Sequence, residues 1–106
     1  MAVSAFSFNL WPPSKRTRAA VVERMVKELS SPSILSKKYG QFDSEQAQVH
    51  AKKIEEEAFS ASQNFAATNP GDSGSHVLQF YSKEVSKLML DTAKLHSSNQ
   101  NPPSAQ

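Results

Sequence analysis

Apolar residues recur at helical spacing in the first third of the chain. Four of them follow the i, i+3, i+4, i+7 pattern of one helix face: Val22, Met25, Val26 and Leu29. Ser14 precedes this stretch, and its hydroxyl can accept hydrogen bonds from the free N–H groups of a helix's first turn. The pattern predicts a helix over residues 15–30.

A short second helix is expected immediately afterwards, over residues 32–39. Ser31 can cap its start, and Pro32 then occupies the first helical position, where proline is favoured. Gly40 offers a left-handed end to the helix. The apolar residues of this segment are Ile34, Leu35 and Tyr39.

A third helix is predicted over residues 44–65. Asp43 precedes it, and Gln46 follows three residues later in an approximate capping box. The apolar face is mostly alanine, with Phe59 and Phe65 nearby, and small side chains favour close approach of a neighbouring helix. The face consists of Ala47, Ala51, Ile54 and Ala58.

The fourth and most regular apolar stripe predicts a helix over residues 75–96. A loop at 66–74 comes first, because Pro70 restricts the backbone and Gly71 frees it. We expect Leu88, in the middle of the stripe, to be fully buried. The stripe consists of Val77, Leu78, Tyr81, Val85, Leu88, Thr92 and Leu95.

These four stripes favour an all-α fold. No stretch alternates with the period of two that a half-buried strand shows. A compact bundle of about four helices buries all the stripes with short connections. We expect a flexible N-terminus at 1–9, a helical domain at 10–96, and a disordered tail at 97–106, which is polar and contains prolines.

Composition narrows the class of protein. With 106 residues the chain can form one small core. It has no cysteine, which excludes a disulfide scaffold, a thiolate metal site and a thiol nucleophile. No apolar run reaches the length of a membrane span, and the first eleven residues do not resemble a secretory signal. We expect a protein of the cytosol or nucleus.

No group of residues favours catalysis, a metal or a cofactor. His50, His76 and His96 lack the spacing of a metal site. Consecutive carboxylates at 55–57 diverge by about 100° around a helix and cannot converge on one bond. Lysines at 52 and 53 precede Glu56 and Glu57 by four residues, which predicts a salt-bridged face in solvent.

Two features break local rules. Lys15, Arg16 and Arg18 lie in the opening turn of the first helix, where the helix dipole disfavours cations. They form either a solvated cluster or a basic patch that faces an acidic partner, since residues 1–40 hold seven basic and two acidic side chains. Trp11 precedes Pro12 and Pro13 in an extended segment. The indole either folds back over the bundle end or is a preorganised anchor for a partner.

Several separated blocks of the chain resemble the plant WPP-domain family in order and spacing. The resemblance extends from about Phe8 to Lys94. The family includes small stand-alone proteins, similar to attachment factors of a filament-like coiled-coil protein, and the N-terminal domain of plant Ran GTPase-activating protein. The matching blocks are residues 11–14, 32–40, 54–59, 81–84 and 86–90.

The resemblance implies a non-enzymatic helical module that docks on coiled-coil anchor proteins at the nuclear envelope. It also implies links to heat-shock cognate chaperones and to the cell plate for some members. Trp11, Pro12 and Pro13 match the family's targeting motif. The chain has no leucine-rich repeats, so no GTPase-activating role is expected.

Lys15, Arg16 and Arg18 would suit the glutamates that often flank coiled-coil seams. The alternative function is a small nucleic-acid-binding domain, although the chain lacks a recognisable reading helix or stacking platform. Its basic residues would be Lys15, Arg16, Arg18, Lys37 and Lys38.

Overall fold

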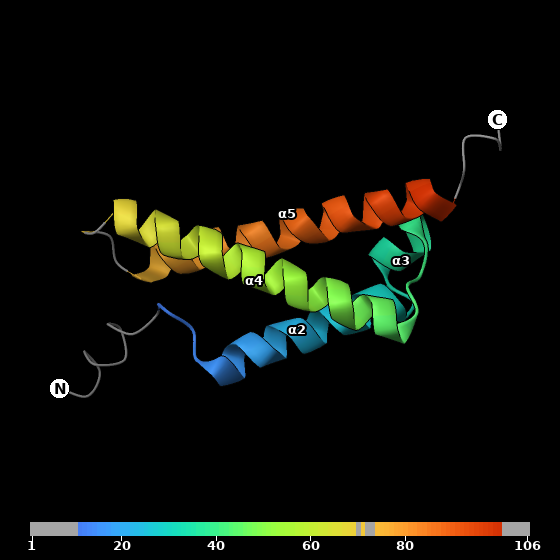
Figure 1. Cartoon of the computed structure of the whole chain (residues 1–106), viewed down its shortest axis with the longest axis horizontal. Helices are drawn as coiled ribbons and strands as arrows, with labels where there is room; N and C mark the ends of the chain where they lie inside the picture. Colours follow the sequence, from blue (N-terminus) through green and yellow to red (C-terminus); the bar gives the residue numbers. More distant parts are fainter. Residues whose placement is uncertain (1–10, 70, 72–73, 101–106) are drawn as a thin grey trace.

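Four helices make up most of the computed structural model, which describes residues 11–69, 71 and 74–100 (Figure 1). They are α2 (Lys15–Ser30), α3 (Ile34–Tyr39), α4 (Ser44–Thr68) and α5 (Gly74–Gln100). No strand occurs in this part of the chain. The all-α prediction is confirmed, and the first helix has the predicted bounds.

Side-chain caps explain where the helices begin. The Ser14 hydroxyl accepts a hydrogen bond from the Thr17 N–H, and the Asp43 carboxylate accepts one from the Gln46 N–H. Both caps are the predicted ones. Each satisfies a backbone N–H that would otherwise lack a partner in the first turn.

The start of α3 differs from the prediction. Ser33 caps this helix: its hydroxyl accepts from the Ser36 N–H, and its own N–H donates to the Ser36 hydroxyl. Ser31 instead ends α2, because its N–H donates to the Lys27 carbonyl. Gly40 ends α3 with a φ of 105°, as its freedom at positive φ permits.

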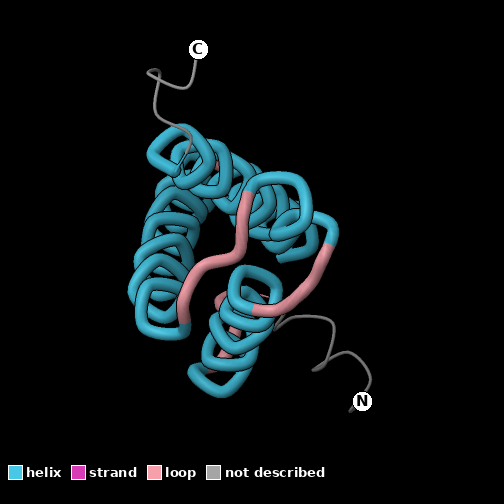
Figure 2. The backbone as a smooth tube through the Cα atoms, turned by 90° about the vertical axis from the view of Figure 1, so that its right-hand side faces the viewer, coloured by secondary structure: helices cyan, strands magenta, loops and turns pink. Residues whose placement is uncertain are grey.

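The two longest helices, α4 and α5, lie antiparallel and side by side (Figure 1). Helix α2 packs against α4, and the short α3 contacts both α2 and α5. Seen along the bundle, α3 therefore closes one end of the space between α2 and α5 (Figure 2). No described helix has both the length and the apolar character that crossing a membrane requires.

The main core lies where α2, α4 and α5 meet. The alanine face of α4 is buried as predicted, and small side chains there bring the helices close together. Buried members of this cluster are Met25, Leu29, Phe42, Ala47, Ala51, Ile54 and Met89.

The predicted stripe of α5 is shifted. Met89 is 4% exposed, whereas Leu88 is only half-buried and Leu95 is 66% exposed. The expectation that Leu88 is fully buried is therefore wrong. In the first half of α5 the buried positions belong to the predicted stripe, but in the second half each lies one residue after a predicted position, so a neighbouring ridge of the helix is buried there. The buried positions are Val77, Tyr81, Met89 and Ala93.

Both long helices extend past their predicted ends. Helix α4 continues to Thr68, and α5 continues to Gln100. The predicted disordered tail is thus wrong for residues 97–100, which are helical. The remaining tail residues, 101–106, and the predicted flexible N-terminus at 1–9 lie outside the described residues.

Candidate functional site

Trp11 packs on the surface that α4 and α5 share. Its ring stacks on Phe59 with centroids 5.3 Å apart and meets the edge of Tyr81 at 5.5 Å. The indole Nε1 donates a hydrogen bond to Gln63 Oε1 at 2.8 Å. Trp11 is half-buried, whereas Pro12 is exposed. The indole therefore folds back over the bundle, and contacts from two helices fix its position.

Arg18 points inward from the first turns of α2. Its Nε and Nη2 donate to the two carboxylate oxygens of Glu55 at 2.7 and 2.9 Å. The guanidinium also lies 3.6 Å from the centroid of the Phe59 ring, on which Trp11 stacks. Arg18 thus links the start of α2 to the platform beneath the tryptophan.

Glu55 is the centre of this cluster. It is 4% exposed and accepts a third hydrogen bond, from the Tyr81 hydroxyl at 2.7 Å. A buried carboxylate needs such compensation, because its desolvation is costly. We call Arg18, Glu55 and Tyr81 the buried triad.

The protonation of the triad follows from its contacts. Burial raises the pKa of Tyr81 far above its ordinary value, and the hydrogen bond to Glu55 raises it further. The hydrogen bond to Glu55 likewise raises the pKa of Arg18. Both groups therefore remain proton donors at neutral pH.

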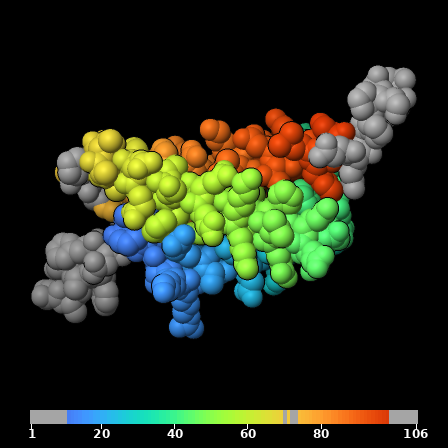
Figure 3. All heavy atoms as spheres, viewed as in Figure 1, coloured from blue at the N-terminus to red at the C-terminus, as the bar shows by residue number. Residues whose placement is uncertain are grey.

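The predicted basic cluster is divided by the structure. Lys15 and Arg16 are exposed at the start of α2, while Arg18 is paired inside. Figure 3 shows side chains of the blue, N-terminal part of α2 projecting from the surface. Of the predicted basic cluster, Lys15 and Arg16 therefore face solvent.

The predicted salt-bridged face of α4 is not present. In the described part of the chain Arg18–Glu55 is the one ion pair, so Lys52 and Lys53 do not pair with Glu56 and Glu57. Glu55 follows Ala51 by four residues and precedes Ala58 by three, which places it on the apolar face.

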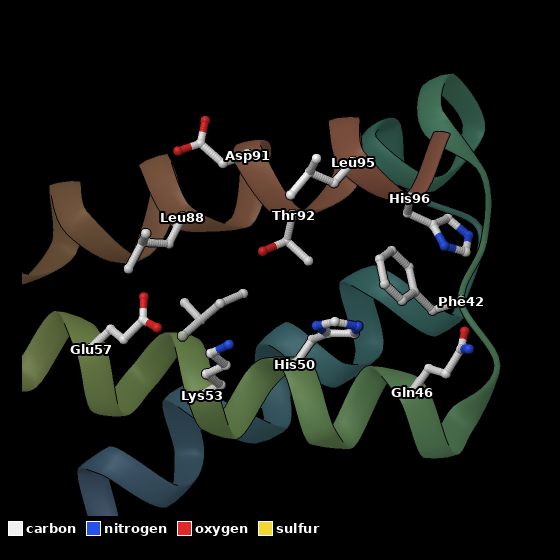
Figure 4. Close-up of a pocket in the computed structure, with 11 residues that line it drawn as sticks. Phe42, Gln46, His50, Lys53, Glu57, Leu88, Asp91, Thr92, Leu95 and His96 are labelled. Atoms are coloured by element: carbon white, nitrogen blue, oxygen red, sulfur yellow. The ribbon is translucent and has the colours of Figure 1, made fainter. Parts of the chain in front are cut away.

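His50 and His96 line a cavity of about 540 Å³ between α4 and α5 (Figure 4). The His96 ring stacks on Phe42 at 3.9 Å, and the His50 ring meets the edge of Phe42 at 5.4 Å. Within the described ranges no three residues of metal-ligating type form a group. The two histidines therefore pack on an aromatic ring at the bundle end.

Sequence comparison identifies the domain. A family model described as "WPP domain" matches residues 7–103. The chain belongs to the WPP domain family. This confirms the resemblance on which the sequence expectations rest, and it places Trp11, Pro12 and Pro13 within the WPP domain.

The curated relatives that this chain matches are longer proteins. MFP1 attachment factor 1 of Solanum lycopersicum is 50% identical over 91 residues, which are 86% of this chain and 59% of the relative. WPP domain-containing protein 1 of Arabidopsis thaliana is 43% identical over 97 residues, 92% of this chain and 61% of the relative. The chain therefore spans about three fifths of the length of these two relatives.

A third relative is much longer. RAN GTPase-activating protein 2 of Arabidopsis thaliana is 50% identical over 91 residues, which are 85% of this chain but 16% of that protein. The similarity thus concerns a small part of the longer protein, and most of its length has no counterpart in the alignment.

Four residues of the site were missed by sequence reasoning as functional candidates: Glu55, Phe59, Gln63 and Tyr81. Three of them come from α4 at spacings of four residues, which places them along one side of the helix. That regular spacing was the available signal. What could not be deduced was that the segment before α2 turns back across this side.

Proposed function

We propose that this WPP domain is a non-enzymatic protein-interaction and targeting module that docks on coiled-coil anchor proteins at the plant nuclear envelope. The observation that carries the proposal is the fixed position of Trp11 on Phe59 and Tyr81, with exposed Pro12 and exposed cations beside it. Family membership supports it, as does the name of the tomato relative, an attachment factor.

The docking surface consists of the Trp11–Pro12–Pro13 segment together with Lys15 and Arg16. Because the segment is already held by a hydrogen bond and two ring contacts, a partner loses less free energy in ordering it. Lys15 and Arg16 face solvent and complement the glutamates that flank coiled-coil seams. Arg18 contributes from within the fold, by supporting the Phe59 ring.

The partners we propose are coiled-coil WPP-interacting proteins of the nuclear envelope and a filament-like coiled-coil protein. The domain would attach to the outer face of the envelope through these proteins. Association with heat-shock cognate chaperones or with the cell plate stays a prediction from the family resemblance.

The nucleic-acid alternative is weakened by the position of Arg18. Its guanidinium donates two hydrogen bonds to Glu55, so one of the five candidate phosphate ligands is occupied within the fold. No described contact favours a nucleic acid over an acidic protein surface.

Charge reversal at the docking surface tests the proposal in plant cells. We compare the full chain, fused to a fluorescent protein, with Lys15→Glu/Arg16→Glu and with the matched control Lys83→Glu/Lys87→Glu on exposed positions of α5. The parent and the control should rim the nucleus, whereas the first variant should be diffuse. All three should keep the same helical circular dichroism, because every substituted side chain is exposed.

Two outcomes count against the proposal. A parent protein that does not rim the nucleus contradicts the proposed localisation. If both double variants become diffuse, overall charge rather than this surface governs targeting, and the assignment of Lys15 and Arg16 fails.

A further inference from the structure

A surface groove lies between α2 and α5. Both helices pack against α4, and α3 contacts α2 and α5, which leaves a cavity of about 440 Å³ along the junction. Met25 and Met89 are buried at its floor, and Leu90 lies at its rim with 38% of its surface exposed. Apolar surface is therefore available for burial by a binding partner. Further apolar lining residues are Val21, Leu35 and Val85.

Lysines border the groove along α5. Lys83, Lys87 and Lys94 are exposed. They lie seven and three residues before Leu90 and four residues after it, which places them on the side of the helix that carries Leu90. The two acidic residues of α5 lie about 100–120° further round the helix. The α5 border of the groove is therefore basic.

The other borders of the groove do not cancel this charge. On the α2 side the groove has one cation and one anion, Arg24 and Glu28. At the end that α3 closes, exposed Lys38 follows the lining residue Leu35 by three positions, on the same side of that helix. The groove thus joins an apolar floor to a basic rim.

We propose that this groove binds one amphipathic helix of a partner protein, with large aliphatic side chains on the floor and carboxylates against the lysines of α5. Helices enter apolar grooves through residues at i, i+3, i+4 and i+7. The rise from Tyr81 to Leu90 along α5 is about 14 Å, and four such anchors span about 11 Å. Lys83 and Lys87 are one turn apart, so two glutamates one turn apart on the partner can face both.

A second copy of the chain is not the occupant that these features favour. The acidic helix of the chain is α4, where Glu45, Glu56 and Glu57 are exposed. Among the described residues of α4, Val49 is the one large apolar side chain that is exposed, because Ile54 and the alanine face belong to the chain's own core. One anchor does not fill a groove that holds four, so the helix belongs to another protein.

The groove is a second binding face, beyond the docking surface of the proposed function. The two meet at Tyr81, which lines the groove and contacts the indole ring at 5.5 Å. Lys15 and Arg16 line other cavities, on the α4 side of α2. Charge reversal of Lys83 and Lys87 should therefore weaken binding in the groove and leave targeting intact. Reversal of Lys15 and Arg16 should do the opposite.

Peptide binding tests the groove. The probe is a synthetic helical peptide with leucine at i, i+3, i+4 and i+7 and glutamates beside them, and a matched peptide has lysine in place of each glutamate. Each carries a fluorophore and is titrated with the full chain at about 0.15 M salt, where exposed charges more than about 8 Å apart are largely screened. The acidic peptide should bind saturably, and the basic peptide at least about tenfold more weakly.

Matched variants locate the binding site. Lys83→Glu/Lys87→Glu should weaken binding of the acidic peptide at least about tenfold. Ser86→Glu adds a carboxylate to the α5 wall of the groove and should weaken binding at least about fivefold. The same change at Ser60, an exposed serine of α4, should leave the affinity unchanged. All variants should keep the helical circular dichroism of the parent, because the substituted side chains are exposed.

Three results overturn the proposal. The first is the absence of saturable binding of the acidic peptide. The second is equal weakening by Ser86→Glu and Ser60→Glu, or by the lysine pair and Lys15→Glu/Arg16→Glu, because overall charge then governs binding. The third is a dimer in sedimentation that Ser86→Glu disrupts, because the occupant is then a second copy. This test measures binding in solution, so a failure of the proposed localisation does not change its outcome.

Discussion

Removal of the Arg18 guanidinium would leave Glu55 as a buried carboxylate without its cation. In Arg18→Met the unbranched side chain keeps most of the hydrocarbon contact but loses the two hydrogen bonds of 2.7 and 2.9 Å. The Tyr81 hydroxyl would be the one described donor left to Glu55. We therefore expect this substitution to destabilise the whole bundle.

The size of the loss follows from the exposure of the two partners. Breaking a fully buried pair costs about 3–5 kcal/mol. The Glu55 side chain is 5% exposed, but the Arg18 side chain is 28% exposed, so water partly replaces the lost donor. With the Tyr81 hydrogen bond retained, we expect the free energy of unfolding to fall by about 2–3 kcal/mol.

A double-mutant cycle isolates the ion pair from packing. Glu55→Gln removes the charge but keeps the shape, and the partly exposed Arg18 can turn to solvent. In Arg18→Met/Glu55→Gln no buried charge remains. The double variant should therefore be more stable than the sum of the single effects predicts, by at least about 1 kcal/mol.

These free energies are measured by urea denaturation, with the helical circular dichroism signal as the probe of unfolding. The fluorescence of Trp11, the chain's one tryptophan, reports at the same time on the ring contact with Phe59. A loss below about 0.5 kcal/mol for Arg18→Met, the level of an ordinary surface substitution, would refute the reasoning.

Three further predictions follow from burial, ionisation and capping. Met89→Ala should cost about 2–4 kcal/mol in unfolding free energy and Leu88→Ala clearly less, because Met89 is buried and Leu88 half-buried; equal losses by urea denaturation would contradict this. The raised pKa of Tyr81 gives stability that is present below about pH 10 and lost as the pH rises further, so Tyr81→Phe should flatten the alkaline fall in unfolding free energy; an unchanged slope argues against it. Asp43→Ala should cost about 1 kcal/mol, because the Gln46 N–H loses its cap; calorimetry showing no shift in melting temperature would count against this role.

The helices could largely be predicted because their signals are local. Ser14 and Asp43 were identified as caps from the residues beside them, and the alanine face of α4 from its spacing. The start of α3 was predicted wrongly, because Ser31 was taken as its cap. Ser33 is the cap because its hydroxyl accepts from the Ser36 N–H while the Ser36 hydroxyl accepts from the Ser33 N–H.

The site could be predicted only in part, because its central contact joins residues 37 positions apart. Arg18 precedes Val22 by four residues and Met25 by seven, so it lies on the inner face of α2, but its charge suggested solvent. Glu55 likewise lies on the inner face of α4 within a run of three glutamates. Each charge is buried because the other compensates it, and no single helix pattern contains that information.

The position of Leu88 shows a second limit. The stripe of α5 was predicted to include Leu88 and Leu95 because both are large and apolar. Close packing of helices also depends on small side chains, which that criterion passes over. Ala93 is buried at 1% exposure, where its size suits close contact. The leucines lie along the adjoining cavity that α4 and α5 border.

The folded-back position of Trp11 is compatible with its proposed role as an anchor. Its contacts with Phe59, Tyr81 and Gln63 bury one side of the segment, and those same contacts fix the position of exposed Pro12. Replacing Trp11 would therefore remove packing and any docking surface together, so a loss of targeting after that change would not locate an interface. Exposed neighbours such as Lys15 separate the two effects, because changing them leaves the described packing intact. The rigidity that the proposed docking needs would follow, in this bundle, from Trp11 being half-buried.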